Sequence, residues 1–172
     1  MYPYSCYSYP SPNPMQARWN NQWCYGWNPQ YYNGYRNIVL QDYGPRPFVV
    51  DIDQATKQNT NFRTVLWTGN HLQVALMSIN PGEDIGLEVH PKTDQFLRIE
   101  EGQGFVQMGG SKDKLDVQVT AHDGYAIMVP AGTWHNVTNT GNRPLKVYSI
   151  YAPPNHPHGT VHVTKADAQE AE

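Results

Sequence analysis

Cysteine is scarce in this chain of 172 residues, and both copies, Cys6 and Cys24, lie near the N-terminus. They cannot cross-link the larger part of the chain, and two cysteines alone do not identify a compartment. No run of 18 or more apolar residues is present, which excludes a membrane-spanning helix. The N-terminus also lacks a basic region followed by an apolar block, so we expect no secretory signal and a cytoplasmic protein.

Charge is low as well. The 12 Lys and Arg residues against 15 Asp and Glu residues give a formal net charge of −3, and no basic stripe stands out. This balance argues against nucleic acid as the main partner. The length is sufficient for one domain of ordinary size with a buried core.

Residues 1–44 differ in composition from the remainder. Up to Arg36 the chain has eight Tyr, three Trp and five Pro, but two charged residues, Arg18 and Arg36. Neither the helical nor the strand period is present, so we interpret residues 1–44 as an irregular, aromatic-rich arm. It is either a solvated extension or an assembly segment, since Tyr and Trp supply large contact areas. As an assembly segment it resembles the tails of some spore-coat and surface-layer proteins. A spore coat or surface layer is therefore the alternative to a cytoplasmic location.

Residues 45–154 alternate between short apolar stretches and turn-forming residues. A short helical turn is expected at 51–58, and strands are expected at 62–67, 72–80, 85–90, 95–100, 104–108, 115–120, 125–129, 135–139 and 145–151. Many short strands at short spacing predict an all-β antiparallel sandwich or barrel. Residues 155–172 form a polar tail, with an edge strand and a terminal segment that frays or forms a short helix. We expect its three histidines to be solvated or packed outside the barrel: His156, His158 and His162.

Two spaced motifs carry the candidate chemistry. The first has Gly82, then Glu88, His90 and Gln95, and ends at Gly102. The second reads GYAIMVPAGTWHNVTN from residue 124 to residue 139 and contains His135. Residues two apart on a strand share a face, so Glu88 and His90 can both point inward, and the HPKTD turn brings Gln95 to the same surface. Such groups are costly to bury without a partner, and a metal ion is one such partner.

The two motifs resemble the pair that defines the cupin superfamily. The resemblance covers about residues 60–152 and implies a single cupin-type antiparallel β-barrel, or jelly roll, with His135 beside the first-motif residues. The second motif is complete. In the first motif, Glu88 stands at the position of the family's first His, and Gln95 stands at the position of the family's Glu. The motif therefore keeps one carboxylate, but at a different position. The resulting ligand types, in a different order, resemble those of the mannose-6-phosphate isomerase-like cupins.

We therefore predict a divalent metal held by Glu88, His90, Gln95 and His135. Mixed N/O ligation without thiolate suits Zn, Mn, Fe, Ni or Co. Gln is a weak neutral donor, so Glu88, His90 and His135 could form the core alone, as in non-haem Fe(II) oxygenases. The remaining alternative is a metal-free hydrogen-bond network.

Three functions stay open at this point. The resemblance implies a sugar or sugar-phosphate isomerase acting on a small polar substrate, with no base identified. The alternatives are an Fe(II)-dependent oxygenase or metal-dependent lyase, and a non-catalytic coat or assembly protein that uses the aromatic arm. Cupins commonly pair through barrel edges, so we also expect a homodimer.

Overall fold

The computed structural model describes residues 37–170. Residues 1–36 of the predicted arm therefore lie outside the described residues, and residues 37–44 lie within them. The described part contains two short helices, α2 (Ile52–Gln58) and α3 (Lys165–Glu170). Its strands are β1 (Arg63–Thr68), β2 (Gln73–Ile79), β3 (Asp94–Glu101), β4 (Gln103–Gly109), β5 (Val117–His122), β6 (Ala126–Val129), β7 (Trp134–Asn139), β8 (Leu145–Ala152) and β9 (Val161–His162).

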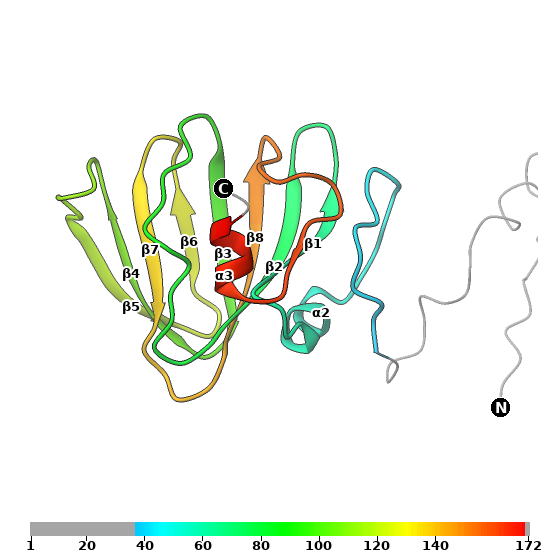
Figure 1. The fold of residues 1–172 in the computed structure, drawn as a ribbon, viewed down its shortest axis with the longest axis horizontal. Helices are drawn as coiled ribbons and strands as arrows, with labels where there is room; N and C mark the ends of the chain where they lie inside the picture. Colours follow the sequence, from blue (N-terminus) through cyan, green and yellow to red (C-terminus); the bar gives the residue numbers. More distant parts are fainter. Residues whose placement is uncertain (1–36, 171–172) are drawn as a thin grey trace, which may run out of the picture. The chain divides into compact units, whose positions relative to one another are not determined.

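The strands form two antiparallel sheets (Figure 1). The larger has the order β6-β3-β8-β2-β1-β9 and the smaller has the order β5-β4-β7. Neighbours in each sheet are often far apart in sequence, as β3 and β8 are, which is typical of a jelly roll rather than a meander. The predicted all-β antiparallel fold is confirmed.

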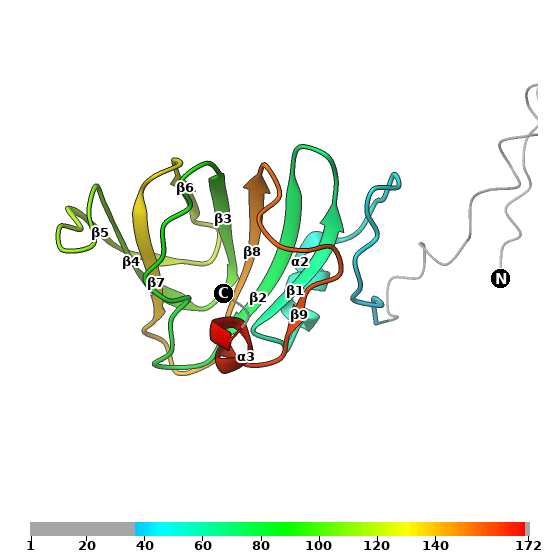
Figure 2. The ribbon, with the colours of Figure 1, turned by 45° about the horizontal axis from the view of Figure 1, so that its top comes forward.

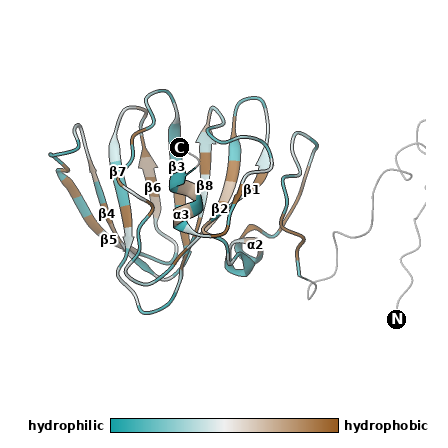
Figure 3. Ribbon diagram, in the orientation of Figure 1, coloured by the Kyte–Doolittle hydropathy of each residue, from teal (hydrophilic) through white to brown (hydrophobic). Residues whose placement is uncertain are grey.

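Strand alternation sets which residues face the interior. Along β3 the side chains of Gln95, Leu97 and Ile99 are buried, at 3%, 0% and 0% exposure. Cross-strand register extends these positions into rows, since Gln95 is opposite Tyr151 and Leu97 is opposite Ser149. Polar and apolar residues alternate along the strands in Figure 3. Leu97 and Ile99 thus share the buried face of Gln95.

The prediction of a regular strand at residues 85–90 is wrong. This segment makes isolated antiparallel bridges to β7, at Asp84–Thr138 and Glu88–His135, instead of a continuous ladder. Gly86 has a positive φ of 93°, and its N–H donates to Asp84 Oδ1 at 2.6 Å. A left-handed residue turns the backbone out of the extended conformation, so regular pairing cannot continue through it.

The outer face of the larger sheet is covered by α2 and by residues before it. The helix begins after Asp51, whose carboxylate accepts from the Gln54 N–H at 3.1 Å, as an N-cap residue does. The outer cluster centres on Ala55, Leu66 and Leu76; partly buried residues pack against it, including Ile38, Leu40, Tyr43, Phe48, Val50 and Ile52. Residues 38–43, grouped with the arm by composition, therefore contribute to the packing of the sheet.

The C-terminal tail returns to the opposite side of that sheet. β9 pairs with β1 as an edge strand, and α3 places Ala168 in the interior cluster with Met77 and Leu97. Figure 2 shows α2 behind the larger sheet and α3 in front of it. Thr164 and Asp167 cap α3 reciprocally, each backbone N–H donating to the other side chain, as in a capping box. The predicted edge strand and terminal helix are confirmed. No helix in the described range is long and apolar enough to cross a membrane.

Candidate metal centre

Glu88, His90 and His135 converge inside the barrel. Glu88 Oε1 lies 3.3 Å from His90 Nε2 and 3.3 Å from His135 Nε2. One ligand atom from each residue lies within 4.8 Å of the other two. His135 is 1% exposed, and the side chains of His90 and Glu88 are 12% and 15% exposed. The structure thus joins residues 45 positions apart into one cluster that could hold a cation.

The backbone explains this convergence. Glu88 and His135 are antiparallel partners: the Glu88 N–H donates to the His135 carbonyl at 3.1 Å, and the return bond is 3.0 Å. The Gly132 N–H donates to the His90 carbonyl at 2.9 Å, which attaches the PAG turn to the first motif. Directly opposed residues on antiparallel strands share a face, so the pairing itself aims both side chains inward.

The hydrogen bonds also orient the His135 ring. Nδ1 lies 3.0 Å from the Thr133 carbonyl oxygen, which can only accept, so we assign the ring proton to Nδ1. Nε2 then faces the Glu88 carboxylate at 3.3 Å. Two electron-rich atoms at this distance repel unless a proton or a metal ion lies between them. The ring is therefore held as a metal-ligating imidazole usually is, with its second nitrogen bonded to a carbonyl.

Electrostatics favour an ionised carboxylate in the cluster. Burial raises the pKa of Glu88, but the His135 and His90 rings beside it outweigh burial and hold that pKa to about 2. Glu88 is thus anionic at neutral pH, the form that a cation requires.

Gln95 lies on the same interior wall. It is 3% exposed, and neither its amide oxygen nor its amide nitrogen has a hydrogen-bond partner among the described residues. Its cross-strand neighbour Tyr151 packs edge-on against His90, with ring centroids 5.6 Å apart. A buried amide without a partner costs about 1–3 kcal/mol. A ligand that accepts or donates to the amide would remove that cost.

The sequence analysis missed a buried arginine, Arg63, and placed His156 incorrectly. Arg63 is 1% exposed and is the cross-strand partner of His162. His156 packs edge-on against Tyr151 at 4.9 Å, so the expectation that these histidines are solvated or outside the barrel is wrong for His156. His158 does lie outside, with a side chain 58% exposed.

The side chain of Gln73 explains the position of His156. Its Oε1 accepts from the backbone N–H of Asn155 at 3.3 Å and of His156 at 2.9 Å, and its Nε2 donates to the His156 carbonyl at 2.8 Å. Burial and, next, the charge of Arg63 lower the pKa of His156 to about 3, so the ring is neutral at neutral pH. No local sequence signal indicates this arrangement, because the contacts span some 80 residues.

A cavity of about 170 Å³ opens beside Glu88. We call it the Glu88 cavity; its lining consists of Phe62, Arg63, Ile85, Gly86, Leu87, Glu88, Lys165, Ala168 and Gln169. Helix α3 therefore forms part of its wall. Lys165 donates to Asp84 Oδ1 at 2.6 Å and thereby attaches α3 to the first motif.

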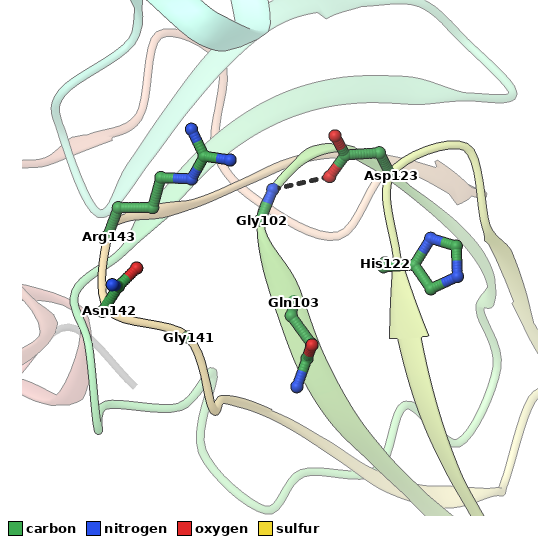
Figure 4. A pocket seen from close by; sticks show the side chains of 7 residues that line it. All are labelled: Gly102, Gln103, His122, Asp123, Gly141, Asn142 and Arg143. Carbon is green, nitrogen blue, oxygen red and sulfur yellow. Dashed lines mark hydrogen bonds between the residues drawn. The ribbon is translucent and has the colours of Figure 1, made fainter.

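A second hollow lies at the other end of β3, roughly 23 Å from Gln95 at the usual rise of an extended strand. Turn residues line it, and Figure 4 shows Gly102 donating to Asp123, a bond of 2.7 Å. The labelled side chains of Gln103, His122 and Arg143 point in different directions. No set of ligating groups converges there among the residues drawn, so we assign the chemistry to the Glu88 cavity.

The residues of the cluster fit a divalent metal. Among residues 37–170 the donors are two imidazole nitrogens and a carboxylate, with no thiolate, and the amide of Gln95 on the same wall has no hydrogen-bond partner in that range. This set suits Zn, Mn, Fe, Ni or Co. The structure brings together three of the four residues predicted from sequence, and the ligand role of all four stays a prediction. His71 and His122 are exposed.

Comparison with known proteins identifies the family. The profile of the Cupin domain matches residues 75–151. The crystal structure of BH2720 from Bacillus halodurans is 68% identical, with a TM-score of 0.75, over 76% of this chain and 98% of that one. The chain belongs to the cupin family.

Two uncharacterized proteins are similar to most of this chain. YrkC of Bacillus subtilis (strain 168), an uncharacterized protein, is 70% identical over 137 residues, which are 80% of this chain and 74% of YrkC. An uncharacterized protein of Acanthamoeba polyphaga mimivirus is 41% identical over 119 residues, 69% of this chain and 72% of its own. The cupin fold predicted from the two motifs is confirmed. The names of these relatives indicate no substrate.

Proposed function

We propose that this cupin binds a divalent metal through Glu88, His90 and His135, with Gln95 as a further oxygen donor, and acts on a small oxygen-rich molecule. The observation that carries the proposal is the convergence of Glu88 Oε1 on the Nε2 atoms of His90 and His135, at 3.3 Å each, inside the barrel. The Thr133 carbonyl orients the His135 ring so that Nε2 faces the other two residues, the orientation of a metal-ligating imidazole.

A divalent cation bound here would supply Lewis-acid polarisation of a substrate oxygen. The protein residues would orient and enclose the substrate. Glu88 contributes the negative charge of the cluster, and the Tyr151 and Ser149 hydroxyls lie on the interior face of β8. Because the cluster is shielded from water, charge interactions within it are stronger than at the surface.

The ligand types resemble those of the mannose-6-phosphate isomerase-like cupins, which suggests aldose–ketose isomerisation as the reaction. It needs a base that moves a proton between neighbouring carbons. His156 is near the cluster, but a pKa of about 3 makes it a poor base at neutral pH. The isomerase proposal is therefore supported by the ligand types alone. Fe(II)-dependent oxygenation and lyase chemistry compete with it.

The test of the metal proposal is elemental analysis of protein purified without chelators. We expect about one divalent ion per chain, and at least a tenfold loss of occupancy at limiting metal in Glu88→Gln and His135→Ala. Glu101→Gln is the matched control, since Glu101 pairs with exposed Arg143 at the far end of β3. Wild-type protein that takes up no divalent ion when one is supplied would refute the proposal.

Activity assays on the metal-loaded protein then distinguish the oxygenase from the isomerase. Oxygen consumption that depends on iron identifies the oxygenase, and conversion of sugar phosphates without oxygen identifies the isomerase. The assembly function predicted for residues 1–44 concerns mainly residues outside the described range. It stays a prediction, as does a cytoplasmic location.

We also propose a homodimer. β5 is an edge strand of the smaller sheet, and Val117 and Val119 on it are 45% and 46% exposed. An edge with unpaired backbone groups and exposed valines favours pairing with a second chain.

A further inference from the structure

We propose that helix α3 clamps the segment that carries Glu88, with Lys165 as a positioning residue for that carboxylate. The inference rests on the proposed metal function and assigns a structural control of the same site. It is carried by one atom, Asp84 Oδ1, which accepts from Lys165 Nζ on α3 and from the Gly86 N–H in the first motif, at 2.6 Å each.

The segment around Glu88 is not part of a continuous ladder. It makes isolated bridges to β7, at Asp84–Thr138 and Glu88–His135. Between the two bridges, Gly86 has a φ of 93° and turns the backbone two residues before Glu88. The direction in which the Glu88 side chain enters the interior therefore depends on the geometry of this turn.

Asp84 links this turn to α3. Its carboxylate bonds the backbone two residues on, at Gly86, which is how an Asp side chain stabilises a turn. The contact of the same oxygen with Lys165 joins two charged groups, so it is stronger than a neutral hydrogen bond. The side chains of Lys165 and Asp84 are 25% and 30% exposed, and salt screens a partly buried pair less than an exposed one. Lys165 thus restrains the carboxylate, and the carboxylate restrains the turn.

The position of Lys165 within α3 also indicates a tertiary role. Lys165 is the first residue of the helix, where a positive charge does not favour the helix dipole. The helix is capped instead by Thr164 and Asp167. The contribution of Lys165 therefore lies in its contact with Asp84 rather than in the local stability of α3.

Apolar packing accompanies the ion pair. Ala168 on α3 is 4% exposed and Ile85 in the first motif is 6% exposed, and both belong to the same interior cluster. The Glu88 cavity is lined by residues of the first motif and of α3. The segment is thus attached to β7 through its backbone and to α3 through side chains. Because coupling between two sites is reciprocal, a metal ion that orders Glu88 should also stabilise α3.

Amide hydrogen exchange, followed by NMR on the metal-free, full-length protein, tests the clamp. The Glu88 N–H donates to the His135 carbonyl, so its exchange reports opening of the segment. We expect Lys165→Met to accelerate this exchange about 3- to 5-fold, the effect of a partly screened ion pair. The Leu76 N–H in central strand β2 reports global opening and should change less.

Two variants are the controls. Lys165→Arg keeps the charge and a donor, so Glu88 should exchange as in wild type. Lys114→Met removes an exposed lysine that pairs with Asp116 at 3.6 Å, and it should also leave the exchange unchanged. Exchange at Glu88 that does not change in Lys165→Met, or that changes equally at Leu76, would overturn the inference.

Zinc titration of the same proteins tests the coupling. We expect bound zinc to slow exchange of the α3 amides in wild type, and Lys165→Met to weaken zinc binding by the same 3- to 5-fold. If Lys165→Met does not fold, the effect of zinc on α3 in wild type still decides the matter.

The outcomes separate the clamp from the metal proposal. Wild-type protein that takes up no divalent ion contradicts the metal proposal, and exchange in metal-free Lys165→Met then decides the clamp alone. Full zinc occupancy with unchanged exchange in α3 contradicts the clamp and leaves the metal proposal intact.

Discussion

Glu88 and His135 are bonded through their backbones in both directions, at 3.1 and 3.0 Å, and their side chains meet at 3.3 Å. The backbone pair fixes the side-chain pair, because directly opposed residues on antiparallel strands share a face. The cluster therefore depends on the short segment around Glu88 staying against β7. Gly132 contributes to that attachment from the turn that precedes β7.

Gly132→Ala tests this attachment. Gly132 has a φ of 78°, its N–H donates to the His90 carbonyl at 2.9 Å, and an added Cβ would meet no atom within 4 Å. The cost should thus be purely conformational, about 1–2 kcal/mol of unfolding free energy. We expect urea unfolding to show this loss together with weaker metal uptake. Gly110→Ala is the control, since its Cβ is equally unobstructed and its φ is not positive; equal losses in both variants would contradict the assignment.

Gln95→Leu is expected to separate stability from function. The amide of Gln95 is buried without a partner among the described residues, so its removal should leave the metal-free protein unchanged or more stable, by up to about 1–3 kcal/mol. Metal affinity should fall in the same variant. Gln73→Leu is the matched comparison: that amide fixes Asn155 and His156, so the metal-free protein should lose stability. Thermal unfolding with and without metal measures both effects, and a marked loss of apo stability in Gln95→Leu would exclude the amide as an unsatisfied group.

Asp42→Asn should change how stability depends on pH. The Asp42 carboxylate accepts from the Thr68 N–H, the Thr68 hydroxyl, and the N–H groups of Gly44 and Gly159. Burial raises its pKa, but these donors outweigh burial and keep the pKa below 3.8. A depressed pKa contributes stability above pH 3.8 that is lost as the pH falls through the folded-state value. We expect the variant to lose about 1–3 kcal/mol at pH 7.

Below pH 4 the same variant should differ less from wild type, because protonation already weakens the wild-type interactions. Urea titrations at pH 7, 5 and 3.5 measure the difference. Asp113→Asn, at an exposed position, is the control for a surface carboxylate. A difference between Asp42→Asn and wild type that is the same at all three pH values would show that the charge of Asp42 is not responsible.

Val119→Lys tests the proposed homodimer. The side chain is 46% exposed on edge strand β5, so a charge there should oppose pairing without disturbing the core. We expect light scattering to show a dimer for wild type and a monomer for the variant, with unchanged thermal stability per chain at high dilution. Val49→Lys, at a site 79% exposed before α2, should remain dimeric. A monomeric wild type would refute the proposal directly.

Local pattern was sufficient for much of the fold. Short apolar stretches separated by turn-forming residues identified strands such as the one that contains Gln95, Leu97 and Ile99, because turn formers end each strand. It failed at residues 85–90, where Gly86 bends the backbone at φ 93°. The spacing of Glu88 and His90 still predicted their convergence, because two residues on one short segment remain close in either conformation.

The sequence by itself determined the all-β class and the two motifs, because each of these depends on residues near one another in the chain. His135 joined Glu88, His90 and Gln95 as a candidate ligand only through the resemblance to the cupin superfamily. Tertiary structure alone decided which distant groups share the interior. Arg63 reaches it through β1, and His156 through contacts with Gln73 and Tyr151. Such contacts depend on strand order and on loops that close over some 80 residues, and no local period encodes either.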